Sequence, residues 1–230
     1  MNPNLLAAPI ALPLFVAALL LAVSRSGGRQ RIALQRWLAV AALTVNLAVA
    51  LALAQFTLDG QRLVLQMGGW IAPFGITLIA DGLSAILLTL TALVALAVLP
   101  FAIATIDLHR ERMAFYPLFL VLVMGVNGAF LTGDFFNLYV FFEVLLMASF
   151  VLLTVGGQPA QTHAGIRYVV LNLLGSLVFL AAAGIAYGTL GTLNMAQMAE
   201  RLDSAPMAVR TLLAGMLLVA FGSKAALFPL

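Results

Sequence analysis

The chain has 230 residues, of which 64% are hydrophobic and 8% are charged, whereas about 25% of the residues of a soluble domain are charged. This composition excludes a soluble globular protein and indicates an integral membrane protein that crosses the bilayer several times. Because cysteine is absent, disulfides, thiolate chemistry and cysteine-ligated metal sites are excluded as well. The net charge of +3 comes from arginines between apolar segments, so it bears on membrane orientation and gives no indication of nucleic-acid binding.

Seven apolar segments each approach or exceed the ~20 residues that a membrane-spanning helix needs. The first is not a signal peptide, because Met1–Asn4 carries no basic side chain and Arg25 is the first arginine. The sequence therefore predicts an all-α, polytopic membrane helix bundle with about seven transmembrane helices. We divide it into residues 1–112 with spans one to three, and residues 113–230 with spans four to seven. The segments are Leu5–Val23, Trp37–Phe56, Leu78–Phe101, Met113–Leu131, Phe135–Val155, Ile166–Leu190 and Met207–Leu230.

The arginines between the spans predict the orientation of the chain in the membrane. Seven arginines fall in alternate connections and three in the others, so the positive-inside rule places the amino terminus outside. We expect a multi-pass protein of a bacterial or archaeal cell (inner) membrane. The seven are Arg25, Arg29, Arg31, Arg36, Arg110, Arg112 and Arg167, and the three are Arg62, Arg201 and Arg210.

Two of the outer connections contain signals for local structure. Residues 61–77 combine a β-prone stretch with Gly-Gly and Pro-Phe-Gly turns, which predicts a small extracytoplasmic hairpin. Asn194 and Gln197 have the spacing of an N-cap and the third helical residue, followed by an apolar stripe. We expect a short interfacial helix there, before span seven.

Glu143 and Lys224 are the ionisable residues that lie deep in predicted spans. Glu143 follows Asp134 by nine residues, which places it about 13 Å along the helix and near the middle of a ~30 Å hydrocarbon core. A carboxylate there costs at least ~2.5–3.5 kcal/mol, so its presence indicates a function in ion movement. Opposite charges on two helices attract, but desolvation offsets much of the attraction. Separation of the pair should favour protonation of Glu143, which suits a switch; a static ion pair is the alternative.

Further polar residues lie along or near these spans. Asp134 is a good helix-start residue and a possible member of a proton pathway, together with Asn137 in span five and Asn172 in span six. Pro229 follows Lys224 by five residues and predicts a broken helix beside the lysine. The sequence ends within an apolar run, so we expect the amino-terminal part of a longer chain. It contains no nucleotide-binding glycine loop or metal-ligand cluster, and we expect no cofactor and no metal.

Several long motifs, in order along nearly the whole chain, resemble one family. They are GGWIAPFGITLIADGLSA (68–85), MGVNGAFLTGDFFNLYVFFEVLLMASFVLL (124–153), RYVVLNLLGS (167–176), YGTLGTLNMA (187–196) and FGSKAALFPL (221–230). The sequence resembles the MrpD-type subunits of the multisubunit Mrp-type cation/proton antiporters, which belong with the antiporter-like subunits of respiratory complex I.

The resemblance implies a fold of about fourteen spans in two inverted repeats, of which this chain would hold the amino-terminal portion. Glu143 matches the family's fifth-span glutamate and Lys224 its seventh-span lysine on a broken helix; in the family this pair gates proton movement. Partners would be other subunits of a membrane hetero-oligomer, and the transported ions would be protons and Na⁺ or another monovalent cation.

Three functional hypotheses remain open from the sequence. The first is the antiporter subunit, which is a transporter and not an enzyme. The second is a proton-pumping subunit of a complex I-like NADH:quinone oxidoreductase or a membrane-bound hydrogenase, where redox chemistry drives similar proton movement. The third is a truncated, non-transporting assembly piece, against which the presence of both Glu143 and Lys224 counts.

Overall fold

The computed structural model describes residues 2–24 and 29–227, and it is an all-helical membrane bundle with a small hairpin at one end. Six of its helices have at least 18 residues and are apolar enough to cross a membrane. A further apolar helix, α5 (Phe115–Leu131), has 17 residues and a length of about 25 Å, which is near the lower limit for a span. The prediction of about seven transmembrane helices is thus confirmed, and the chain is a multi-pass membrane protein.

The amino-terminal helices pack around α5. A short 3-10 helix, η1, precedes α1, and the core between α1, α2, α3 and α5 consists of aliphatic and aromatic side chains, mostly leucine and alanine. Helix α5 also packs extensively against α6, so it joins this group to the carboxyl-terminal helices. The elements are η1 (Pro3–Ala7), α1 (Ala8–Ser24), α2 (Arg29–Thr57), α3 (Gly82–Thr105) and α4 (Leu108–Arg112).

A proline inside α1 explains one buried contact in this group. Pro13 has no N–H, so the carbonyl of Pro9 lacks the usual helical donor four residues later. The Nδ2 of Asn127 on α5 donates to this Pro9 oxygen at 2.8 Å. Asn127 is completely buried, and its amide therefore links α5 to α1 where the helical hydrogen bond is missing.

The hairpin lies where the sequence predicts one, but it extends three residues further. Strands β1 (Leu63–Gln66) and β2 (Thr77–Ala80) pair antiparallel, with Leu63 opposite Ala80; a short 3-10 helix, η2 (Met67–Gly69), follows β1. The third span consequently begins at Gly82 and not at Leu78. Asp81 caps this helix in a reciprocal pair of hydrogen bonds with Ser84. The backbone N–H of Ser84 is the main cause of the lowered pKa of Asp81, and burial opposes it.

The carboxyl-terminal helices pack around α7, which contacts both α6 and α9. Helix α7 begins at Pro159, seven residues before the predicted start, so Arg167 lies inside the helix and not in the connection. The predicted short helix is present, and the Oδ1 of Asn194 accepts from the backbone N–H of Gln197 at its start; its location at the membrane interface stays a prediction. The elements are α6 (Phe135–Thr154), α7 (Pro159–Leu190), α8 (Met195–Leu202) and α9 (Met207–Lys224).

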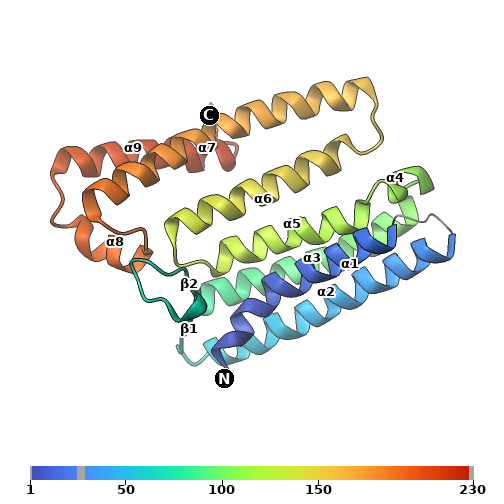
Figure 1. Cartoon of the computed structure of the whole chain (residues 1–230), viewed down its shortest axis with the longest axis horizontal. Helices are drawn as coiled ribbons and strands as arrows, with labels where there is room; N and C mark the ends of the chain where they lie inside the picture. The colour runs from blue at the N-terminus through green and yellow to red at the C-terminus, as the bar shows by residue number, and fades with distance from the viewer. Residues whose placement is uncertain (1, 25–28, 228–230) are drawn as a thin grey trace.

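The connections alternate between the two ends of the bundle. Figure 1 shows the hairpin and α8 at one end, and α4 with the α6–α7 connection at the other. Arg110 and Arg112 on α4 and Arg36 on α2 belong to this second end. This arrangement agrees with the alternation of arginine-rich and arginine-poor connections from which we predicted the orientation. The side of the membrane that each end faces stays a prediction.

Candidate functional site

Glu143 lies in the middle of α6, where its side chain is half-buried. Its Oε1 is buried and has no hydrogen-bond partner among the described residues. Buried polar atoms in proteins are nearly always satisfied, and an exception at membrane depth is expensive to maintain. This oxygen is therefore free to accept a hydrogen bond.

Lys224 is the last residue of α9, and its ammonium group contacts two other helices. The Nζ donates a hydrogen bond to the Oγ of Ser176 on α7 at 3.1 Å. It also lies 5.4 Å from the centroid of the Phe142 ring on α6, within the range of a cation–π interaction. Placement at the carboxyl end of α9 favours the positive charge further, because the helix dipole is negative there.

Glu143 and Lys224 lie near each other on different helices without forming a direct ion pair. The Nζ of Lys224 faces the ring of Phe142, the residue before Glu143 on α6, and no salt bridge joins the lysine to Glu143 in the described part of the chain. The structure therefore brings the two predicted residues to one site and holds the lysine on Ser176. A role of either residue in proton movement stays a prediction.

Aromatic side chains fill the space between α6, α7 and α9 next to this site. Phe179 on α7 is fully buried and stacks on Tyr139, with ring centroids 6.0 Å apart. It also meets Phe142 and Phe221 edge-on, at 6.1 and 5.4 Å. These ring contacts place apolar side chains next to Lys224, whose Nζ lies 5.4 Å from the Phe142 centroid.

Asp134 and Asn137 stabilise the start of α6 instead of approaching Glu143. The Oδ1 of Asp134 accepts from the backbone N–H of Asn137 at 2.7 Å, and the Nδ2 of Asn137 donates to the Oγ1 of Thr132 at 3.0 Å. Burial raises the pKa of Asp134, while the hydrogen bonds from backbone N–H groups oppose that change. The backbone of Asp134 also forms a bridge with Asn194, which ties this helix start to that of α8. Their membership of a pathway stays a prediction.

Asn172 lies on α7, four residues before Ser176. Its Nδ2 donates to the backbone oxygen of Tyr168 at 2.9 Å. The Tyr168 hydroxyl in turn lies 2.9 Å from the Oγ of Ser149 on α6. These polar groups extend along the α6–α7 interface from the level of Ser176, so Asn172 is the predicted pathway residue with the best placement.

The predicted helix break at Pro229 lies outside the described residues. Within them, α9 already ends at Lys224, and Ala226 has a positive φ of 53°. The backbone N–H of Leu227 donates to the carbonyl of Gly222 at 2.9 Å, which closes the helix end. Helix α9 therefore ends before the proline is reached, and the break at Pro229 stays a prediction.

The sequence reasoning missed a buried carboxylate at the other end of the bundle. Glu111 on α4 is 1% exposed, and Arg36 on α2 binds it through Nε at 3.0 Å and Nη2 at 2.8 Å to both oxygens. The Tyr116 hydroxyl on α5 donates to the same carboxylate. The sequence analysis placed Arg36 in a connection between spans. Its partner Glu111 lies 75 positions away, and no short sequence pattern links the two residues. The signal available was a glutamate among the arginines of a short polar segment.

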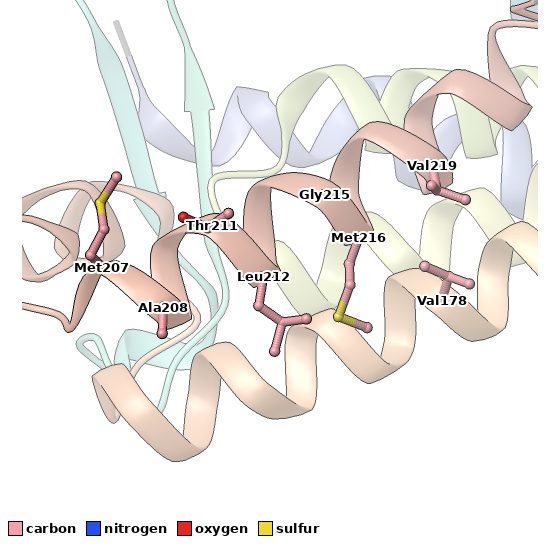
Figure 2. Close-up of a pocket in the computed structure, with 8 residues that line it drawn as sticks. All are labelled: Val178, Met207, Ala208, Thr211, Leu212, Gly215, Met216 and Val219. Carbon is pink, nitrogen blue, oxygen red and sulfur yellow. The ribbon is translucent and has the colours of Figure 1, made fainter.

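An apolar groove lies between α7 and α9 and includes neither Glu143 nor Lys224. It has a volume of about 730 Å³. Figure 2 shows Leu212 and Met216 from α9 and Val178 from α7 facing the same space. Within the described ranges, no three His, Cys, Asp or Glu side chains come close enough to hold a metal ion.

Several known proteins with similar sequences are named as antiporter subunits. Residues 132–230 match the model of the family described as NADH:quinone oxidoreductase/Mrp antiporter, transmembrane. The chain is 39% identical to the D-type subunit of a Na⁺/H⁺ antiporter of Alkalihalophilus pseudofirmus, over 99% of this chain and 45% of that protein. It is 42% identical to the D-type subunit of a probable K⁺/H⁺ antiporter of Rhizobium meliloti, over 99% of this chain and 42% of that protein. The chain thus spans less than half the length of these relatives.

Two solved structures share the fold. A chain of the Mrp complex from a Dietzia species is 34% identical, with a TM-score of 0.88 over the whole of this chain and 42% of that chain. A chain of an archaeal membrane-bound sulfane sulfur reductase is 26% identical, with a TM-score of 0.91 over 99% of this chain and 46% of that chain. The fold is accordingly part of an antiporter-like fold, and the resemblance noted from the sequence is confirmed. Residues 132–230 match the NADH:quinone oxidoreductase/Mrp antiporter transmembrane family, and the whole chain is similar to the MrpD-type subunits of Mrp antiporters.

Proposed function

We propose that this chain forms a proton-translocating part of a multisubunit monovalent cation (Na⁺)/H⁺ antiporter, in which Glu143 and Lys224 carry the proton step. The names of the relatives support sodium or potassium as the exchanged cation. Because the chain spans less than half of their length, exchange is a property of the full-length subunit with its partner subunits. We further propose that the complex lies in the cell membrane with the amino terminus outside.

One observation carries the proposal: a carboxylate and an ammonium group interact from separate helices and are not fixed to each other. The Oε1 of Glu143 lacks a hydrogen-bond partner among the described residues, and Lys224 is bonded to Ser176. An approach of Lys224 stabilises the carboxylate form of Glu143, and its withdrawal favours the protonated form. Movement of the lysine therefore couples proton occupancy to the geometry of α6 and α9.

In this mechanism a proton binds to Glu143 while Lys224 is on Ser176, and leaves when Lys224 returns toward the carboxylate. An external proton gradient supplies the energy for export of the cytoplasmic cation. The aromatic packing of Phe142, Phe179 and Phe221 keeps bulk water from one side of the pair. A proton leak past the site is thereby reduced.

The test is sodium-dependent proton flux in inverted membrane vesicles from a host that lacks its own antiporters. The full-length subunit is expressed with its partner subunits, as wild type and as Glu143→Gln. Glu200→Gln is the matched control, because Glu200 is an exposed carboxylate on α8. We expect flux in the wild type and the control and none in Glu143→Gln. Undiminished flux in an assembled Glu143→Gln complex would refute the proposed role.

The similarity to a chain of the archaeal respiratory membrane complex favours a second candidate, a redox-driven proton-pumping subunit. That candidate predicts proton movement that depends on an electron donor and does not require sodium. A wild-type complex that is fully assembled yet gives no sodium-dependent flux would favour it.

A further inference from the structure

The hydrogen bond between Lys224 and Ser176 is unusual for a hydroxyl inside a helix. Other such hydroxyls here, including those of Ser149 and Ser223, donate to a carbonyl one turn earlier in their own helix. The partner of the Ser176 hydroxyl in the described structure is the Nζ of Lys224 at 3.1 Å. Ser176 is 1% exposed, so this oxygen is aimed at the lysine and not at solvent.

The backbone beside Ser176 allows α9 to approach α7 closely. Gly175 is buried, and a Cβ at this position would overlap the Oγ of Ser223 on α9. The absence of a side chain at Gly175 lets the two helices come close enough for the lysine at the end of α9 to reach Ser176. The ring of Phe142 on α6 also lies beside the ammonium group, with its centroid 5.4 Å from the Nζ.

We propose that Ser176 is a positioning residue that, with the Phe142 ring, holds Lys224 in a separated position away from Glu143. This proposal rests on the proposed function and adds to it that the lysine alternates between two partners, Glu143 and Ser176. An ammonium group at membrane depth is expensive without an acceptor. A hydroxyl and a ring face lower that cost, so the separated position becomes accessible during turnover.

Ser176→Ala removes the acceptor and adds no bulk. We expect the maximal rate of sodium-dependent proton flux to fall about tenfold, which corresponds to the loss of one hydrogen bond to a charged group. The sodium concentration that gives half-maximal flux should not change, since the substitution acts on the lysine and not on cation binding. Ser176→Thr keeps the hydroxyl and should restore the rate.

Ser223→Ala is the matched control at the same helix crossing. Its hydroxyl donates to the carbonyl of Ala220 and does not contact Lys224 in the structure. We expect wild-type flux. A cryo-EM map of the assembled complex with Ser176→Ala adds a measurement that does not depend on transport, and it should show Lys224 in an ion pair with Glu143.

The outcomes separate this inference from the proposed function. Flux that survives in Glu143→Gln overturns the proposed function and the inference with it. Loss of flux in Glu143→Gln together with a wild-type rate in Ser176→Ala overturns the inference alone. Equal losses of flux in Ser176→Ala and Ser176→Thr would mean that Ser176 only packs the helices. A cryo-EM map of Ser176→Ala in which Lys224 keeps its position would have the same meaning.

Discussion

Removal of Arg36 should destabilise the protein more than removal of its partner. Glu111 is 1% exposed and receives hydrogen bonds from Arg36 and Tyr116, whereas the Arg36 side chain is 35% exposed. Arg36→Met leaves a buried carboxylate with the tyrosine hydroxyl alone. A broken buried ion pair costs about 3–5 kcal/mol. Because water reaches Arg36 in part, we expect about 3 kcal/mol, at the lower end of that range.

Glu111→Gln has a smaller expected effect, because the arginine left behind can be solvated. The double substitution Arg36→Met with Glu111→Leu removes both charges and places apolar atoms in the same volume. The buried Tyr116 hydroxyl loses its acceptor in this variant, so we expect a loss of about 1–2 kcal/mol, which is smaller than that of Arg36→Met. The order of stability is then wild type first, Glu111→Gln and the double variant next and Arg36→Met last.

The assay is equilibrium unfolding of the full-length subunit in mixed detergent micelles with increasing SDS. Arg110→Met serves as the control, because Arg110 pairs with Asp107 on the surface at 3.4 Å, where both side chains are exposed; no measurable change is expected there. A double variant as unstable as Arg36→Met would show that the loss comes from packing and not from an unpaired charge, and the reasoning would be wrong.

Two further substitutions test contacts at the opposite end. Asn127→Leu leaves the buried carbonyl of Pro9 without a donor and should cost about 1–3 kcal/mol in SDS unfolding; Pro13→Ala restores the helical N–H and should rescue it, and no rescue would contradict the assignment. Asp81→Ala removes the helix cap with Ser84 and should cost about 1 kcal/mol at neutral pH. Since the pKa of Asp81 is lowered in the fold, its contribution is present above the unfolded pKa of about 3.9 and is lost as pH falls through the folded value. A difference in thermal stability that stays constant down to pH ~3 would count against that cap.

The spans and helix starts could be predicted because their signals are local. An apolar run near 20 residues long has few alternatives in a membrane, and Asp134 and Asn194 cap α6 and α8 as their positions suggested. The start of α7 was missed by seven residues, since its first two turns, from Pro159, are polar. Polar residues can continue a helix beyond its apolar region, and hydropathy alone does not identify that part of the helix.

The contacts of the candidate site could be predicted only in part. The sequence identified Glu143 and Lys224 as unusual because a charge at membrane depth is costly wherever it points. It could not supply Ser176 as the partner of the lysine, 48 positions away, or Arg36 as the partner of Glu111. Partners so far apart in sequence depend on how helices cross, and one sequence without related sequences does not contain that information.

Glu111 and Glu143 have contrasting surroundings in the fold. Arg36 binds Glu111 at both oxygens and the Tyr116 hydroxyl donates to one of them, so this carboxylate has charge-assisted partners. These contacts fix α2, α4 and α5 to one another. Glu143 has a buried oxygen without a hydrogen-bond partner among the described residues, and Lys224 is held by Ser176. Because Glu143 is free to take a new partner and Glu111 is not, we propose the ion-coupled chemistry at the interface of α6, α7 and α9.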